Sequence, residues 1–170
     1  MKSSHAKLLF LTGLVIVLMT VSHTAAASVE VKLIKPEKYR DIEQAGFSQK
    51  KSIEVINKDV QKFFDSVATS YIPESNKLLI EVTDIDLPGR VEYMVGPNFE
   101  NIRILRSDDI FKLYFNYKLI DKNGKVVKEG EEKLRDYFNQ NTATRLKKIK
   151  TFAHFNRKLS KWFEQNFSQL

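Results

Sequence analysis

The stretch IFKLYFNYKLIDKNGKVVKEGEEKLR, residues 110–135, decides the fold. From Ile110 to Asp121 apolar and polar residues alternate, which is the pattern of a strand with one buried face. Asn123-Gly124 follows and predicts a two-residue type I′ turn, because both central residues of that turn need positive φ. Residues 125–135 return as a second strand, so the sequence predicts an antiparallel hairpin.

The turn also fixes which residues of the hairpin face each other. On the polar face it predicts the pairs Ile120–Val127, Lys118–Glu129 and Tyr114–Lys133. On the apolar face it predicts the pairs Tyr117–Gly130, Phe115–Glu132 and Phe111–Asp136. Gly130 then leaves room for the Tyr117 ring, and Glu132 points toward the packed side.

Other segments complete the fold. Strands are predicted at 28–34 and 77–87, with a short one at 102–106, whereas 91–101 has the composition of a loop. A helix is predicted from an N-cap at Ser48 to about Ser70, before Pro73, and a second from about Thr144 to Gln169. The prediction is a two-layer α+β fold: a mostly antiparallel sheet of four to five strands with two amphipathic helices on one face. The first strand, helix and second strand suggest a crossover, right-handed if the strands are parallel.

Composition limits the chemistry of the chain. It has 170 residues, 28 Lys+Arg against 21 Asp+Glu, and a hydrophobic fraction of 42%, which fits one globular domain. The absence of cysteine excludes disulfides, thiol catalysis and cysteine metal sites. Three histidines leave little room for catalysis based on imidazole.

The first 27 residues are typical of a secretory signal. Lys2 and Lys7 precede an apolar run from Leu8 to Val21, and Ala25 and Ala27 fit the small residues before a cut. We expect cleavage between Ala27 and Ser28 and a periplasmic protein. An uncleaved anchor is the alternative, but the run spans only about 21 Å of a hydrocarbon core roughly 30 Å thick.

Cleavage would leave residues 28–170 as a single domain. Loss of Lys2 and Lys7 lowers the formal net charge from +7 to +5. His154 would be the one remaining histidine. No GxSxG or SxxK motif accompanies it, so we expect a solvated helix residue and neither a catalytic base nor a metal ligand.

Glu132 heads a predicted polar cluster. A carboxylate on the packed side needs a partner, and Arg90, Arg103 or Arg106 could donate a bidentate pair. Alternatively, a bulge turns Glu132 outward or the pair is purely structural. With an arginine partner, Glu132→Gln would lower stability more than neutralising the aspartates discussed next.

Asp84 and Asp86 belong to the same predicted cluster, together with Asp136. Strict alternation after Leu78, Ile80 and Val82 would place both aspartates on the apolar face. Either a bulge near Thr83 resets the alternation, or the two carboxylates line the end of that face. In the second case they could hold a hard cation or act as an acid/base pair.

The last predicted helix carries a basic face. Its apolar positions are Leu146, Ile149, Phe152, Ala153, Leu159, Phe163 and Phe167. Its basic residues gather on the other side: Lys147, Lys150, Arg157, Lys158 and Lys161. Such a face can bind an anionic envelope component or an acidic protein partner, or it can be a solvated back.

Four stretches resemble one known family. They are residues 36–42 after the opening strand, the segment VTDIDLPG at 82–89, the hairpin residues GKV and GEEKLRD at 124–136, and Trp162-Phe163. They are similar to a family of short exported proteobacterial proteins known only as a domain of unknown function. The resemblance implies no activity, substrate or cofactor.

Two functions remain open on sequence alone. We favour a non-enzymatic binding or envelope-associated module, with no cofactor, no metal and no transmembrane span after signal cleavage. The alternative is a hydrolase or cation-dependent enzyme using Asp84, Asp86 and Glu132. Nucleic-acid binding is disfavoured, because positive charge alone is not specific for it and an exported protein does not meet it.

Overall fold

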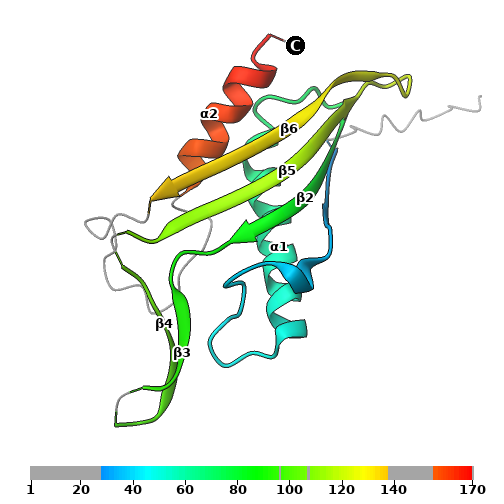
Figure 1. Ribbon diagram of the computed structural model, residues 1–170. Coiled ribbons are helices and arrows are strands. Elements are labelled where there is room, and N and C mark those ends of the chain that lie inside the picture. The colour runs from blue at the N-terminus through cyan, green and yellow to red at the C-terminus, as the bar shows by residue number, and fades with distance from the viewer. Residues whose placement is uncertain (1–27, 96, 107, 138–154, 170) are drawn as a thin grey trace, which may run out of the picture.

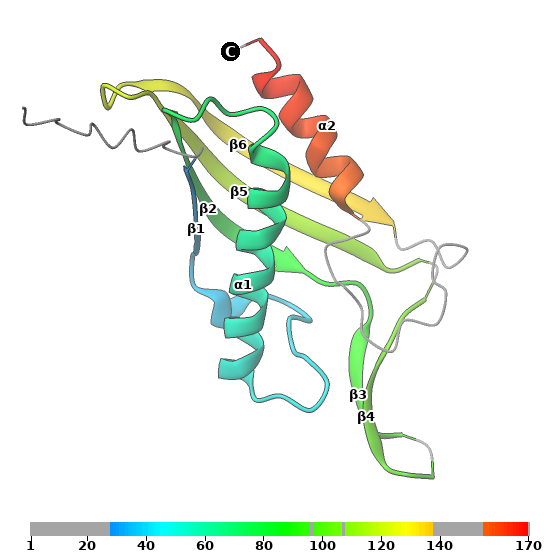
Figure 2. The ribbon, with the colours of Figure 1, turned by 180° about the vertical axis from the view of Figure 1, so that it is seen from behind.

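A four-stranded sheet with two helices on one of its faces forms the body of the protein (Figures 1 and 2). The computed structural model describes residues 28–95, 97–106, 108–137 and 155–169. The main sheet has the order β1-β2-β5-β6, and a second sheet contains β3 and β4. The predicted α+β architecture is confirmed. In chain order the elements are β1 (Ser28–Leu33), the 3₁₀ turn η1 (Pro36–Lys38), α1 (Gln49–Ala68), β2 (Lys77–Asp86), β3 (Arg90–Val95), β4 (Glu100–Ile104), β5 (Ile110–Ile120), β6 (Val126–Tyr137) and α2 (Asn156–Phe167).

The first half of the body is a β1–α1–β2 crossover. β1 pairs with β2 in parallel, as a strand–helix–strand segment suggests. Ser48 is the N-cap of α1, and its side-chain oxygen accepts from the Lys51 backbone N–H at 3.3 Å. The helix buries Ile56, Val60 and Phe64 against the sheet.

The predicted β5–β6 register is confirmed away from the turn. Tyr117 pairs with Gly130 and Phe115 with Glu132. The turn itself differs from the prediction: Ile120 pairs with Val126, not Val127, and an irregularity between Leu119 and Ile120 absorbs the extra residue.

Asp121 explains the different turn. Its carboxylate accepts from the backbone N–H groups of Asn123 and Lys125 at 2.8 and 2.9 Å. Its carbonyl accepts from Gly124 N–H at 3.0 Å. Gly124 has a φ of 80°, but Asn123 is not among the positive-φ residues, so the type I′ prediction is wrong. The hydrogen bonds to the Asp121 carboxylate therefore stabilise a longer loop than the two-residue turn that Asn123-Gly124 predicts.

A bulge in β2 resolves the ambiguity at its aspartates. The pairing with β5 shifts between Val82 and Asp84, so Ile85 and Leu87 are buried and the aspartates face away from the helices. The buried hydroxyl of Tyr39 donates to the Val82 carbonyl at 2.6 Å and accepts from Ile34 N–H at 2.9 Å. Tyr39 thus ties the segment after β1 to the bulge.

An aromatic cluster joins α2 to the sheet. Trp162 lies edge-on to Phe64, Phe115 and Tyr117, with ring centroids 5.0–6.5 Å apart. Phe163 and Phe167 are also buried, as predicted for the apolar side of this helix. Residues 144–154 of the predicted helix lie outside the described residues, and with them Leu146, Ile149, Phe152, Ala153 and His154.

A β-hairpin projects from one end of the main sheet (Figures 1 and 2). The sequence predicted a loop at 91–101, but β3 and β4 pair antiparallel across this region. Its apolar side chains are largely exposed, with Met94 and Phe99 both 72% accessible, so no burial pattern marked the strands in the sequence. Neither helix is long and apolar enough to cross a membrane in the part of the chain that the structure describes.

Candidate functional site

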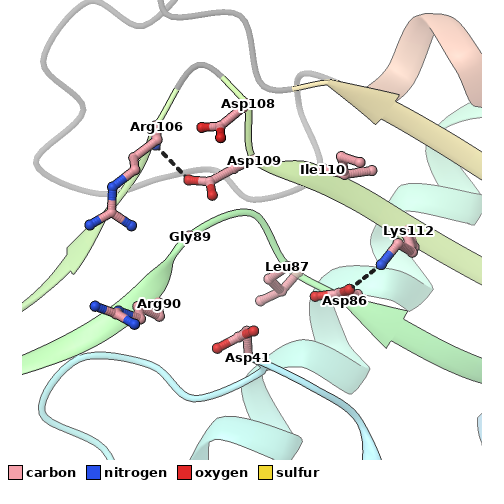
Figure 3. Close-up of a pocket in the computed structure, with 10 residues that line it drawn as sticks. All are labelled: Asp41, Asp86, Leu87, Gly89, Arg90, Arg106, Asp108, Asp109, Ile110 and Lys112. Atoms are coloured by element: carbon pink, nitrogen blue, oxygen red, sulfur yellow. Dashed lines mark hydrogen bonds and ion pairs between the residues drawn. The ribbon is translucent and has the colours of Figure 1, made fainter.

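A polar cleft of about 310 Å³ opens where β2 ends and the hairpin begins (Figure 3). Four separate segments form it: the loop before α1, the β2–β3 connection, the β4–β5 connection and the start of β5. The lining residues are Asp41, Asp86, Leu87, Gly89, Arg90, Arg106, Asp108, Asp109, Ile110 and Lys112. Leu87 is buried beneath a mainly charged surface.

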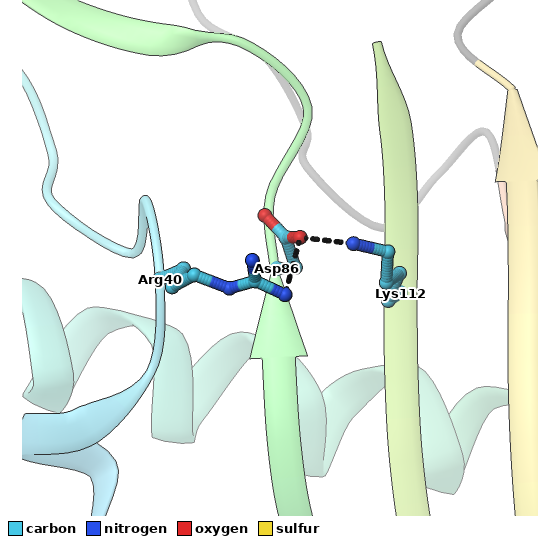
Figure 4. Close-up of polar contacts among 3 residues, drawn as sticks. All are labelled: Arg40, Asp86 and Lys112. Atoms are coloured by element: carbon cyan, nitrogen blue, oxygen red, sulfur yellow. Dashed lines mark hydrogen bonds and ion pairs between the residues drawn. The ribbon is translucent and has the colours of Figure 1, made fainter.

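Asp86 is held by two cations at one end of the cleft (Figure 4). Its Oδ2 lies 2.6 Å from Lys112 Nζ and 3.5 Å from an Arg40 guanidinium nitrogen. Lys112 is its partner across the strands, and the Arg40 backbone forms a β-bridge with Asp86. The Asp86 side chain is only 13% exposed, so these contacts neutralise a poorly solvated carboxylate.

Arg103 fixes the walls of the cleft. One terminal nitrogen donates to the Pro88 and Gly89 carbonyls at 3.0 and 2.7 Å. The other donates to the Asp41 and Glu43 carbonyls, both at 2.5 Å. Burial lowers the pKa of Arg103, while the charges of Asp41, Glu43 and Asp109 raise it. Arginine is effectively always protonated in proteins, so the Arg103 guanidinium carries a positive charge.

Gly89 allows the two walls to meet. It has a φ of 68°, and a Cβ there would lie far inside van der Waals contact of the Ile104 carbonyl oxygen. Only glycine fits this close approach of the β2–β3 connection to β4.

The remaining charges of the cleft are only partly paired. Arg90 donates to Glu92 at 3.3–3.4 Å, and Asp109 accepts from the backbone N–H of Arg106 at 2.5 Å. Within the described residues, the side chains of Asp41, Arg106 and Asp108 make no hydrogen bond or ion pair. The cleft therefore exposes both signs of charge.

The sheet separates the predicted carboxylate cluster. Asp84 and Asp86 pair with Tyr114 and Lys112 on the face away from the helices. Glu132 lies opposite the buried Phe115, on the helix-covered face. The three acids therefore do not form one site, and the predicted Asp84/Asp86/Glu132 enzyme site is not assembled.

Within the described residues, Glu132 pairs with none of the three arginines that the sequence suggests as partners. It is half-buried and accepts from the backbone N–H of Lys133 at 3.0 Å. Burial and, secondarily, the Glu132 charge raise the pKa of Tyr117. Arg90 and Arg103 lie at the cleft instead. Asp136 lies 3.8 Å from Lys158 of α2.

The predicted basic face is only partly as expected. Arg157 and Lys161 are exposed on α2. Lys158 is half-buried and leans toward Asp136, so it does not belong to that exposed face. Lys147 and Lys150 lie outside the described residues. The described residues include no group of three or more His, Cys, Asp or Glu arranged to hold a metal ion.

Sequence reasoning missed most of the cleft. Of its residues it singled out Asp86 and Arg90, and it considered Arg106 only as a partner for Glu132. Asp108-Asp109 before a predicted strand is a local signal that could have drawn attention to this end of the sheet. Asp41 and Lys112 carry no such signal, because only the fold brings them to the β2 end.

The chain matches one protein family and has low similarity to several solved structures. A family model described as "Protein of unknown function (DUF3016)" matches residues 27–165. No curated protein matches the chain.

Two of the similar solved structures are bacterial lipoproteins by description. A candidate lipoprotein from Caulobacter crescentus is 13% identical, with a TM-score of 0.36, over 83% of this chain and 90% of that one. A minor lipoprotein from Acinetobacter baumannii is 8% identical, with a TM-score of 0.32, over 83% of this chain and 94% of that one. Similarities this low transfer no function.

Proposed function

Because the chain belongs to the DUF3016 family of proteins of unknown function, we propose a function from its own residues: it is an exported, non-enzymatic module that binds an anionic surface of the cell envelope through its helical layer. The observation that carries this proposal is the excess of basic side chains on the outer sides of α1 and α2.

Export is supported by the N-terminal sequence. Residues 1–27 have the charged start, apolar run and small residues of a cleavable signal. The family match begins at residue 27, next to the proposed cut. We therefore place residues 28–170 in the periplasm as one domain.

The helices expose more positive than negative charge. Their exposed basic residues are Lys50, Lys51, Lys58, Lys62, Arg157 and Lys161. Their exposed acids are Asp65, Glu164 and Glu54, the last of which pairs with Lys51, and Asp59 is half-buried near Lys58 and Lys62. An excess of one sign on one face attracts an oppositely charged surface.

The opposite face of the sheet has no such excess. There, ion pairs join Lys77 to Glu30, Lys118 to Glu129 and Lys133 to Glu131 at 2.6, 3.2 and 2.9 Å. The first two pairs cross between neighbouring strands and the third lies along β6, and pairing of this kind cancels charge locally. The helical layer is therefore the face that an anionic surface would select.

Contact with that surface would be electrostatic and not insertive. The apolar residues of α2, including Trp162 and Phe163, are buried against the sheet and cannot also enter lipid. Binding should therefore weaken as salt shortens the range of the charges.

Vesicle co-sedimentation tests the proposal. The purified protein is mixed with vesicles of phosphatidylcholine alone or with one quarter phosphatidylglycerol, at low and high salt. We expect binding only to the anionic vesicles, and loss of binding at high salt. Each basic residue near an anionic membrane contributes about 1 kcal/mol. Lys58→Gln, Lys62→Gln and Lys161→Gln combined should therefore lower the partition coefficient by up to about 100-fold.

A matched control exists on the sheet face. Combining Lys77→Gln, Lys118→Gln and Lys133→Gln removes the same charge from side chains that are already ion-paired, and it should leave binding nearly unchanged. Equal losses in both variants would indicate non-specific attraction and contradict the proposal. Failure of the wild type to bind anionic vesicles would also reject it, and capture of an acidic protein through the same lysines would replace lipid by a protein partner.

A further inference from the structure

We propose that the cleft at the end of β2 is a binding site for a small zwitterion, a free amino acid or a short peptide with both termini uncapped. The site lies on different elements from the basic helical layer and does not depend on the proposed envelope contact.

The cleft is open to solvent, but its walls are held in place. Its volume of about 310 Å³ lies at the lower end of the range for small-molecule sites. Arg103 bonds four backbone carbonyls from two of its walls, and Gly89 lets those walls approach. A ligand would therefore meet walls already in place, which lowers the entropy cost of binding.

Opposite charges are separated across the cleft. Figure 3 shows the guanidinium groups of Arg90 and Arg106 at one end and the Asp86–Lys112 ion pair at the other. In that view the carboxylates of Asp108 and Asp41 lie on opposite sides of the β2–β3 connection, Asp108 above it and Asp41 below it. On the outer sheet face charges pair directly, whereas in the cleft the side chains of Arg106 and Asp108 make no hydrogen bond or ion pair among the described residues, and Asp41 is only near the Arg103 charge.

This arrangement selects a ligand with both signs of charge. A carboxylate can accept from the planar guanidinium groups of Arg106 and Arg90, the latter bonded to Glu92 only at 3.3–3.4 Å. An ammonium group can donate to Asp108 on one side of the cleft or to Asp41 on the other. A ligand carrying only negative charge would be repelled by the aspartates, and one carrying only positive charge would be repelled by the arginines. Each would therefore bind more weakly than a zwitterion, which is attracted by both.

Capped dipeptides separate these cases. The probes are L-Ala-L-Ala, its N-acetylated form without the ammonium group, and its C-amidated form without the carboxylate, together with a pool of free amino acids. Backbone amide shifts of the purified protein are followed by NMR during titration. We expect saturable shifts at Gly89, Arg106 and Asp109 with the uncapped dipeptide or the pool, and at least tenfold weaker binding of each capped form.

Two variants assign the charged groups. Arg106→Gln should weaken binding of the uncapped dipeptide at least fivefold and remove the difference in affinity between the uncapped and the C-amidated dipeptide. Asp108→Asn should likewise remove the difference in affinity between the uncapped and the N-acetylated dipeptide. Lys118→Gln, on the exposed sheet face, is the control and should change none of these affinities. The proposal is overturned if neither the dipeptide nor the pool gives saturable shifts at the cleft, if a capped form binds as well as the uncapped one, or if both variants behave as the control.

Discussion

Single residues set the geometry of the cleft, and Gly89 and Arg103 do so by different means. Gly89 supplies a left-handed backbone with no side chain, next to the Ile104 carbonyl. Arg103 supplies donors to four carbonyls. Both join the β2–β3 connection to its surroundings, so a change at either should loosen the site.

Gly89→Ala should be strongly destabilising. The new Cβ would combine a left-handed φ with a clash against backbone, and we expect a loss of at least about 2 kcal/mol in urea unfolding. Gly46→Ala is the control, because Gly46 has a φ of 81° but nothing within 4 Å of the position of a Cβ. It should lose only about 1 kcal/mol, from the backbone alone. Equal losses would show that the Ile104 contact does not matter.

Neutralising Asp86 should cost more stability than neutralising Glu132, which reverses the expectation from sequence. Asp86→Asn weakens contacts to Lys112 and Arg40 at a poorly exposed position, and we expect a loss of about 1–3 kcal/mol. Glu132→Gln removes no ion pair within the described residues and should stay within about 0.5 kcal/mol. Chemical unfolding of both variants decides the order, and a larger loss at Glu132 would mean that it has a charged partner after all.

At the scale of elements, the sequence predicts the helices and strands that bury one face and expose the other. Apolar residues alternate in β5 and recur every three or four positions in α1, at Ile56, Val60 and Phe64. These patterns indicate one buried face, and both elements lie where expected. β3 and β4 have no such pattern, because their apolar residues are mostly exposed. The exact hairpin turn was missed because the Asp121 side chain competes with the backbone preference of Asn123-Gly124.

The β2 bulge could not be predicted from the residue pattern alone. The sequence left two options for Asp84 and Asp86, because it is equally compatible with a bulge and with two acids on the apolar face. Tertiary contact with Tyr39 accompanies the bulge, and no local pattern encodes that contact. The cleft was missed for the same reason, as its residues meet only through the fold.

The contact between η1 and the bulge should be sensitive to alkaline pH. Burial raises the pKa of Tyr39 from 10.0 to about 12. The folded protein thus holds this proton more tightly than the unfolded chain does. The resulting stability is complete below pH 10 and is lost as pH rises through about 12.

Tyr39→Phe isolates this effect. At pH 8 the variant should be about 1–3 kcal/mol less stable, because the buried Val82 carbonyl loses its hydroxyl donor. Between pH 10 and 11 the difference from wild type should shrink by about 1 kcal/mol. Urea unfolding at each pH measures the difference, and a constant gap would place the Tyr39 pKa near its ordinary value.

At the scale of the whole molecule, the two faces of the body differ in charge. The helical layer carries an excess of exposed basic residues, and the open face of the sheet carries ion pairs between and along its strands. The cleft lies where β2 ends and the β3–β4 hairpin begins, and Figure 2 shows this hairpin projecting from that end of the sheet. A surface bound by the helices would therefore leave the cleft free for its own ligand.

Export should produce a chain that begins at Ser28. The prediction follows from Ala25 and Ala27 before the cut, and it is checked by intact mass and N-terminal sequencing of protein from the periplasmic fraction. Recovery of residues 8–21 in the membrane fraction would mean that the segment is an uncleaved anchor.

The Arg103 clamp has a consequence for motion. Its four bonds join the loop containing Asp41 and Glu43 to the connection that starts the β3–β4 hairpin, segments some fifty residues apart in the chain. Neither segment can detach without breaking its bonds to the shared Arg103 guanidinium. In native-state hydrogen exchange the two should therefore open together as one cooperative unit, with a shared free energy below that of global unfolding. Local opening of these two segments would then be a single event in which both walls of the cleft separate and close again together.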